Sequence, residues 1–328
     1  MHALELRAYG EPLRLIEKPT PRPGCGEVLI RMAASPINPS DLMFLRGLYG
    51  LKKPLPVVPG FEGSGVVVES GGGFLANILK GRRVACVAPD HGDGTWAEQM
   101  VTSAMRCVPL MKSVSLDQGS MMVVNPWTAW ALMDIAKRGS HSAIANTAAA
   151  SSLGRMLLRL GQRFQIPIVH IVRRSEQVDL LGKLGADPVL NSEEPDFDDQ
   201  LKKTFRKLHV SLAFDAIGGE MTGRLLGALP SGGRVMVYGG LSEGLCTASP
   251  FDFIFQRKRV EGFWLSDWLQ QMNVFQRFKM AFALQKLLSS DLQSGICARV
   301  PLSEVSSAID TYGAEMTKGK FLITPTLP

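Results

Sequence analysis

Apolar and polar positions follow different patterns in the two halves of the chain. Up to about residue 120, short apolar runs are bounded by glycine and proline, as in strands that bury one or both faces. The clearest runs are Val28–Met32, Gly63–Glu69 and Arg83–Ala88. The pattern therefore predicts a β-rich, turn-rich region at the start of the chain.

After Asn125, apolar runs alternate with amphipathic stretches. Alternating strands and helices favour a parallel sheet covered by helices on both faces. From Phe263 onward, an amphipathic helix over about Val274–Leu288 leads into short strand-like pieces. The strands and helices predicted for the alternating part are Ala143–Asn146, Gly154–Phe164, Ile168–Val172, Glu176–Leu184, Leu212–Ala216, Met221–Leu229 and Val235–Tyr238.

Composition predicts a globular protein with two domains. The 328 residues exceed the usual size of one domain. Because 45% of residues are hydrophobic and 20% are charged, with no long uncharged apolar run, we expect a soluble protein without a membrane partner. The net charge of +6 is modest and the basic residues are spread out, so no nucleic-acid partner is expected.

Cysteine spacing and the N-terminal sequence bear on the compartment. The cysteines at positions 25, 86, 107, 246 and 297 show no paired spacing, which favours reduced thiols over a disulfide framework. The first residues enter a strand pattern at once and lack the apolar segment of a signal peptide. A cytoplasmic location is therefore expected.

Short motifs spread along the chain are Ile37–Asp41, Arg46–Gly50, Gly94–Glu98, Asn125–Ala129 and Gly262–Ser266. With them the chain resembles the zinc-independent branch of the medium-chain dehydrogenase/reductase superfamily, in particular the mitochondrial-type 2-enoyl thioester reductases and the NADPH:quinone reductases. The resemblance covers nearly the whole chain and is more specific for the fold than for the substrate.

The resemblance implies an α/β fold with two domains. A Rossmann domain with a doubly wound parallel sheet, residues 123–262, would be inserted in a β-rich, GroES-like substrate domain made of residues 1–122 and 263–328. It also implies a homodimer. The strand-like segment Arg259–Phe263, which follows Phe251–Phe255, is the edge through which we expect two sheets to join.

Two positions set this chain apart from the zinc alcohol dehydrogenases of the superfamily. Where those enzymes bind the catalytic metal with a cysteine and a histidine, this chain has Asn38 and Phe61. A site that needs three ligands of the Cys, His or carboxylate type cannot be assembled from an amide and a phenyl ring. We therefore expect no metal site and hydride transfer without a Lewis acid.

The segment Ile144–Arg155 is the candidate nucleotide-binding turn. Of the glycines in a G-x-G-x-x-G turn it keeps only the last, Gly154. The resemblance aligns residues 148–154 with an alanine-rich version of the turn, in which Ser151 and Ser152 replace two glycines. Alternatively, one of these serines is only the N-cap of the next helix, and both interpretations hold together if that helix binds the phosphates.

Charge at the end of the following strand bears on the choice of cofactor. Here the chain has Arg173, Arg174 and Ser175, with no acid before Glu176. An acid at this place bonds the ribose of NAD, whereas arginine accommodates the 2′-phosphate of NADP. We therefore expect NADPH, although paired arginines at a strand end are also typical of a solvated loop.

Glycines follow two further strands, at residues 215–219 and 238–242. In a parallel sheet these carboxyl ends face the ligand, but tight turns explain the same glycines. The other residues for which the resemblance implies cofactor contacts are Thr128, Ala150, Leu153, Asn191, Ala216, Gly239, Trp264 and Lys320.

Tyr49 is the candidate proton donor. The resemblance to enoyl reductases assigns the protonating role to this tyrosine, and Asn38 would orient the substrate or the cofactor. Because quinone reductases also carry a tyrosine in this loop, Tyr49 fits both chemistries. Phe44, Trp127 and Trp264 would line an acyl channel or pack in the core.

These inferences lead to one preferred function and two alternatives. We expect zinc-independent, NADPH-dependent reduction of an activated carbon–carbon double bond, with a small-molecule 2-enoyl thioester as the first choice of substrate. The second hypothesis is an NADPH:quinone reductase. The third, which the altered nucleotide turn supports, is a catalytically weak NADPH-binding sensor protein.

Overall fold

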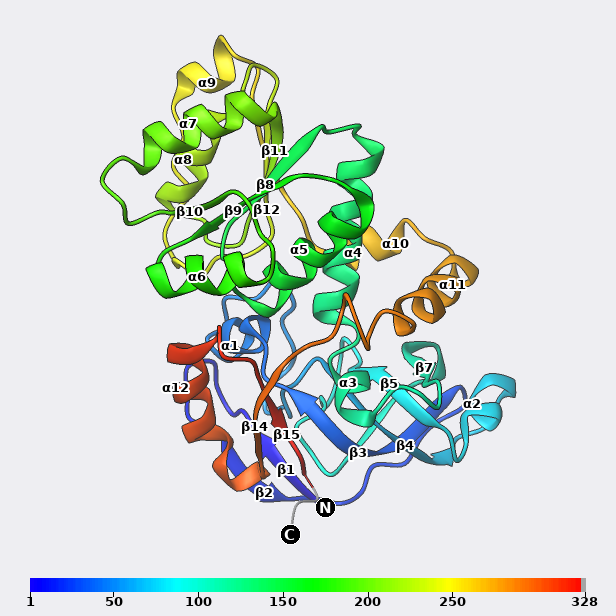
Figure 1. Cartoon of the computed structure of the whole chain (residues 1–328). Coiled ribbons are helices and arrows are strands. Elements are labelled where there is room, and N and C mark those ends of the chain that lie inside the picture. The colour runs from blue at the N-terminus through cyan, green and yellow to red at the C-terminus, as the bar shows by residue number, and fades with distance from the viewer. Residues whose placement is uncertain (326–328) are drawn as a thin grey trace. The chain divides into compact units, whose positions relative to one another are not determined.

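The computed structural model describes residues 1–325, except the side chains of residues 314 and 315, and the chain forms two compact units (Figure 1). Unit 1 comprises Met1–Pro126 and the chain from Phe278 onward, and unit 2 comprises Trp127–Arg277. The sequence predicts boundaries at 122/123 and 262/263. These two boundaries stay predictions of where the independently folding domains begin and end.

Unit 1 is built on a mainly antiparallel sheet that joins the two ends of the chain. Its strand order is β14-β15-β3-β4-β5-β7, with β6 paired to β3, and β1 and β2 form a separate hairpin. β15 lies antiparallel to β3, with Leu322 beside Pro36. The strands are β1 (His2–Glu5), β2 (Arg14–Glu17), β3 (Glu27–Pro36), β4 (Glu62–Ser70), β5 (Arg83–Val87), β6 (Gln99–Ser103), β7 (Cys107–Pro109), β14 (Ile296–Val300) and β15 (Lys320–Ile323).

Short helices connect the strands of unit 1. α1 follows β3 directly, so the end of β3 positions the first residues of that helix. The helices are α1 (Pro39–Leu45), α2 (Phe74–Leu79), η1 (Ala104–Arg106), α3 (Leu116–Ser120), η2 (Leu302–Glu304) and α12 (Val305–Glu315), while α4 (Val124–Arg138) and α11 (Val274–Gln285) run across the boundaries between the units.

Unit 2 is a parallel sheet with strand order β10-β9-β8-β11-β12-β13. The chain starts at β8, winds outward to β10, and then returns to β11, so β8 and β11 mark the point where the winding reverses. The strands are β8 (Ala143–Asn146), β9 (Ile168–Val172), β10 (Val189–Asn191), β11 (Val210–Asp215), β12 (Arg234–Val237) and β13 (Arg259–Gly262).

Helices cover both faces of this sheet. The helices are α5 (Ser152–Phe164), α6 (Ser175–Lys183), α7 (Phe197–Leu208), α8 (Glu220–Ala228), α9 (Pro250–Ile254) and α10 (Leu265–Gln270). Phe205 of α7 and Leu225 of α8 pack with Val169 in one apolar cluster, while Leu158 of α5 and Leu181 of α6 belong to another. Because both faces are covered, every residue of β9 is buried, which explains why all of them but His170 are apolar.

The predicted α/β fold is confirmed, with a doubly wound parallel sheet in one unit and a β-rich second unit. The bounds predicted for β8 and β9 are those observed, because both strands are buried and end at clear turns. The sequence did not predict α4 or α12. The strand-like segment Arg259–Phe263 contains β13, and Phe251–Phe255 before it lies mostly in α9, which Pro250 begins and the Ser249 side chain caps.

Candidate active site

A buried cluster of polar side chains forms where three strands of unit 1 meet. Asn38 follows β3, Glu62 begins β4 and Lys320 begins β15, and each side chain is at most 2% exposed. Asn38 Nδ2 donates to Glu62 Oε1 at 2.9 Å, and the Lys320 ammonium donates to Asn38 Oδ1. The amide of Asn38 therefore bridges a carboxylate and an ammonium.

Main-chain donors and a tyrosine complete the cluster. Glu62 Oε2 accepts hydrogen bonds from the main-chain N–H groups of Val123 and Val124, each at 2.9 Å. Lys320 Nζ also donates to the Tyr312 hydroxyl at 3.5 Å. These bonds satisfy groups that would otherwise be costly to bury.

Asp41 is a second buried acid beside this cluster. Its Oδ2 accepts from the Asn38 N–H at 2.8 Å, and its Oδ1 accepts from the Phe61 N–H at 3.2 Å. Burial raises the pKa of Asp41 to about 7, against the lowering effect of these bonds, and the charge of Glu62 raises it further. Burial also raises the pKa of Glu62 and lowers that of Lys320 to about 8. Two acids thus share one cation.

Tyr49 lies beside this cluster, on an aromatic group. Its half-buried ring stacks at a tilt on Phe61, with 4.8 Å between ring centroids. Phe61 in turn packs edge-on against the buried ring of Phe44 at 5.4 Å, and Phe44 against Tyr9 at 5.7 Å. The fold therefore brings Tyr49 and Asn38 into one region of unit 1, through Phe61 and its neighbour Glu62.

Unit 2 carries the candidate nucleotide-binding turn between β8 and α5. Ala148 has φ +48°, a left-handed conformation that alanine seldom adopts, so this turn holds backbone strain. A Cβ on Gly154 would lie 2.3 Å from the carbonyl oxygen of Ala149. The retained glycine is thus required because the helix packs directly on the turn.

Ser151 is the N-cap of α5, and Ser152 is its first residue. The Ser151 hydroxyl accepts a hydrogen bond from the Gly154 N–H at 3.1 Å. Ala150 is buried, while Leu153 is half-buried in the first turn of the helix. The N-cap interpretation is therefore confirmed, and it leaves phosphate binding at the same helix terminus a prediction.

The paired arginines lie at the carboxyl end of β9. Arg173 and Arg174 are exposed, and so is Ser175, the first residue of α6. Asn191 ends the neighbouring strand β10 with Val172 as its partner, and its side chain bonds within its own turn, donating to Glu194 at 3.1 Å. The sheet thus brings these predicted residues to one edge.

A third group of polar atoms lies where β8 and β11 end. Asp215 is fully buried and accepts hydrogen bonds from the hydroxyls of Thr147 and Thr222, each at 2.8 Å. These bonds fix the turn that contains Ala216, where a Cβ on Gly239 would lie 2.7 Å from the Ala216 oxygen. Tight packing of two turns therefore accounts for Gly239, and its contact with the cofactor stays a prediction.

The remaining predicted residues are found in both units. Thr128 is buried in α4 and Trp264, 39% exposed, is the N-cap of α10, both in unit 2. Lys320 belongs to unit 1 together with Tyr49 and Asn38. Phe44 and Trp127 are at most 5% exposed and thus serve as core residues.

Sequence reasoning missed Glu62 and Asp41 as parts of these sites, and it singled out the strand end at residues 215–219 without the threonines that bond Asp215. A signal was present for Glu62, a charged residue at the head of an apolar strand, and for Asp41, three residues after the N-cap position of a helix. Within residues 1–325, no group of three His, Cys, Asp or Glu side chains is placed to hold a metal ion. Among the described helices, none has the length and apolarity needed to span a membrane.

Comparisons with known proteins cover both units. The family model Alcohol dehydrogenase GroES-like domain matches residues 24–112, and the model Zinc-binding dehydrogenase matches residues 152–283. A structure from Mesorhizobium loti, assigned as an NADPH:quinone reductase, is 35% identical with a TM-score of 0.90, and the match covers 99% of this chain and 98% of that one.

Curated relatives are mitochondrial enoyl-[acyl-carrier-protein] reductases. The Xenopus tropicalis protein is 32% identical over 274 residues, which cover 80% of this chain and 77% of the relative. The Mus musculus protein is 29% identical, and the match covers 99% of this chain and 88% of the relative. With the two-unit fold and this full-length similarity, the chain belongs to the medium-chain dehydrogenase/reductase superfamily of oxidoreductases.

Proposed function

We propose that the protein is a zinc-independent, NADPH-dependent reductase of an activated carbon–carbon double bond, with a 2-enoyl thioester as its substrate. The observation that carries the proposal is the similarity to an enoyl-[acyl-carrier-protein] reductase over 99% of the chain. The position of Tyr49 beside a buried polar cluster supports it.

NADPH fits the residues of unit 2. α5 begins at the candidate nucleotide-binding turn with Ser151 as its N-cap, and the N-terminus of a helix favours a phosphate group, so the pyrophosphate would bind there. Arg173, Arg174 and Ser175 are exposed at the strand end where a 2′-phosphate is recognised, and arginine makes bidentate bonds to phosphate. The cofactor is therefore NADPH.

The chain's own residues supply binding and a proton. NADPH, when bound, provides a hydride for the β-carbon of the enoyl group. Negative charge then develops on the thioester enolate, and the Tyr49 hydroxyl donates its proton to it. The contact with Phe61 holds the Tyr49 ring in place. Because Tyr49 is half-buried, solvent can reprotonate its hydroxyl after the transfer. Asn38 links the ends of β3, β4 and β15 through its bonds to Glu62 and Lys320.

Quinone reduction is the second candidate, because the Mesorhizobium loti structure at 35% identity is assigned to that activity. A steady-state screen of NADPH oxidation with crotonyl-CoA beside a simple benzoquinone separates the two. Efficient turnover of the thioester supports the first proposal. Turnover of the quinone alone contradicts it, and cofactor binding without turnover of either would support the sensor hypothesis.

We further propose a homodimer in the cytoplasm. β13 is the outer strand in the described order of the unit 2 sheet, and an uncovered outer strand offers N–H and C=O groups to a second copy. Light scattering at micromolar concentration tests the dimer, and fractionation of cells expressing the full chain tests the compartment.

A further inference from the structure

The loop that carries Tyr49 is held by a buried lysine. We call residues 46–60, between α1 and β4, the tyrosine loop. Lys53 lies within it and is 5% exposed, which is unusual for a lysine. Its main chain encloses the Tyr9 hydroxyl, which accepts from the Lys53 N–H and donates to the Lys53 oxygen, both at 3.1 Å.

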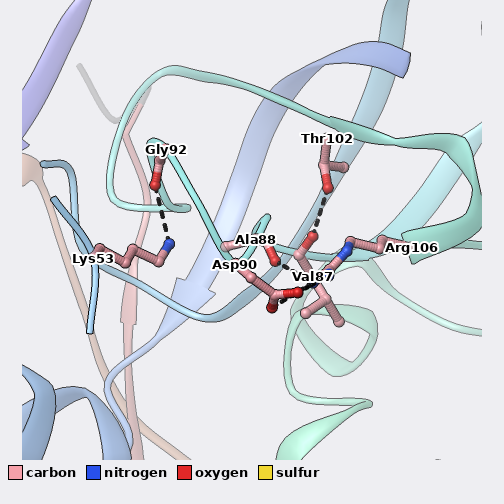
Figure 2. Close-up of polar contacts among 7 residues, drawn as sticks. All are labelled: Lys53, Val87, Ala88, Asp90, Gly92, Thr102 and Arg106. Carbon is pink, nitrogen blue, oxygen red and sulfur yellow. Dashed lines mark hydrogen bonds and ion pairs between the residues drawn. The ribbon is translucent and has the colours of Figure 1, made fainter. Parts of the chain in front are cut away.

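The Lys53 ammonium is directed away from the loop, toward the turn after β5. Figure 2 shows Lys53 Nζ donating to the Gly92 carbonyl oxygen, at a distance of 3.1 Å. This bond joins the tyrosine loop to a segment 39 residues further along the chain.

That segment is itself fixed, as Figure 2 also shows. The Thr102 hydroxyl donates to the Val87 oxygen, and Arg106 Nη1 donates to the Ala88 oxygen, each at 2.9 Å. Arg106 also forms a two-point ion pair with Asp90. Side chains of β6 and η1 thus bond the carbonyl groups of Val87 and Ala88, which fixes the start of the turn that Lys53 contacts.

The charge on Lys53 is costly at this place. Burial lowers its pKa to about 8, although Asp90 and Asp93 favour the charged form. An apolar side chain of similar length would avoid this cost. Among the described residues, the ammonium forms one hydrogen bond, to the Gly92 oxygen. We therefore look to this bond for the role that offsets the desolvation of the ammonium.

Ring contacts connect Lys53 to the candidate proton donor. Tyr9, which binds the Lys53 main chain, packs on Phe44, Phe44 on Phe61, and Phe61 on Tyr49, with centroid separations of 5.7, 5.4 and 4.8 Å. Tyr49 is thus held by its ring contact with Phe61, and Lys53 holds the loop to which Tyr49 belongs.

We propose that Lys53 is a positioning residue for Tyr49: its ammonium fastens the tyrosine loop to the Gly92 turn and so keeps the Tyr49 hydroxyl in place for proton delivery. The proposal deepens the function proposed above and rests on it for its catalytic part.

A double-mutant cycle tests the catalytic part. Lys53→Met removes the ammonium and keeps most of the stem, and we expect kcat for crotonyl-CoA to fall roughly 10-fold, because small misplacements of a reacting group are costly. In a Tyr49→Phe background the same change should cost less than about twofold, since the hydroxyl that Lys53 positions is gone. Equal losses in both backgrounds overturn the proposal.

Lys18→Met is the matched control. Lys18 lies outside the tyrosine loop and pairs with Asp93 Oδ2 in the same turn, while Asp93 Oδ1 accepts from the Val58 N–H of the loop at 3.0 Å, a bond that Lys18→Met leaves in place. We expect this variant to keep the parent kcat. A loss equal to that of Lys53→Met would show that any disturbance of the turn has the same effect and would overturn the specific role of Lys53.

Hydrogen–deuterium exchange tests the structural part without reference to activity. Lys53→Met should speed exchange in peptides of residues 46–60, and Lys18→Met should not. Unchanged exchange in Lys53→Met overturns the proposal whatever the enzyme reduces. Faster exchange in a protein that reduces no enoyl thioester would support the role of Lys53 in the loop and refute the proposed function alone.

Discussion

Asn38 stands where the zinc alcohol dehydrogenases of the superfamily have a metal ligand, and here it bonds to protein groups. The amide nitrogen donates to Glu62 and the amide oxygen accepts from Lys320, so both polar atoms have protein partners. A neutral amide between an acid and a cation links β3, β4 and β15 directly. At the residue scale, hydrogen bonds among protein groups thus organise the polar cluster, and the proposed function assigns the proton chemistry to Tyr49.

Tyr49→Phe separates the two proposed substrates. The change keeps the ring on Phe61 and removes only the hydroxyl, so NADPH binding should persist. Since a positioned acid contributes about 10²–10⁴-fold, kcat for an enoyl thioester should fall at least about 10-fold. Quinone reduction should change little, because water can protonate a hydroquinone anion. Steady-state kinetics with both substrates measures this, and an unchanged rate with crotonyl-CoA would remove Tyr49 from the mechanism.

Arg173 and Arg174 should determine the choice of cofactor. Replacing both by alanine removes charge-assisted bonds to the 2′-phosphate that contribute roughly 1.5–3 kcal/mol each. NADPH affinity should therefore fall at least about 10-fold while NADH affinity hardly changes. Fluorescence titration with both cofactors measures the effect. Lys183→Ala, which removes an exposed charge at the other end of α6, is the control, and equal losses for NADPH and NADH would show a structural role.

At the scale of elements, the β8 turn and α5 depend on one glycine. A Cβ at position 154 would lie 2.3 Å from the Ala149 oxygen, so Gly154→Ala should shift the turn and lower both stability and NADPH affinity. The matched control is Gly182→Ala in α6, where a Cβ meets nothing within 4 Å. There alanine should stabilise the helix by about 0.5–1 kcal/mol. Urea unfolding compares the two, and equal effects would refute the steric argument.

The dimer prediction belongs to β13. Arg259 donates its N–H to Gly233, the residue before β12, and Phe263 donates its N–H to Val237, the last residue of β12, so the Gly262 N–H points outward. Gly262→Pro removes that donor at a position where a side chain meets nothing within 4 Å. We expect the dissociation constant of the dimer to rise roughly 10-fold in sedimentation experiments, since one bond per copy is lost. A parent protein that is monomeric would contradict the dimer itself.

Stability of the whole molecule should depend on pH in two opposite ways. Between about pH 3.8 and 7 the native Asp41 binds more protons than the unfolded chain, so the unfolding free energy should fall as pH rises. Between about pH 8 and 10.5 the unfolded chain binds more protons than native Lys53 and Lys320, so the unfolding free energy should rise.

Urea unfolding across these ranges measures both trends. Asp41→Asn keeps an acceptor for the Asn38 N–H and should flatten the acid range, and Lys53→Met should flatten part of the alkaline range. If Asp41→Asn follows the same curve as the parent from about pH 4 to 7, Asp41 is not responsible for the trend.

Much of the fold could be predicted because its signals are local. β8 and β9 are short apolar runs bounded by turns, and Gly154 marks the start of a helix that packs on its own turn. The sequence carries a weaker signal for α4, since apolar residues lie on most of its faces and leave no clear polar stripe.

The sequence by itself thus determined the fold class, the alternation of strand and helix, and the strand end with its two arginines, since periodicity and turn residues act over a few positions. Only the tertiary structure decided that Lys320 meets Asn38, 282 residues away, and that Lys53 meets Gly92. The physical reason is burial: a charged group inside the protein must have partners, and those partners come from whichever strands the fold brings together.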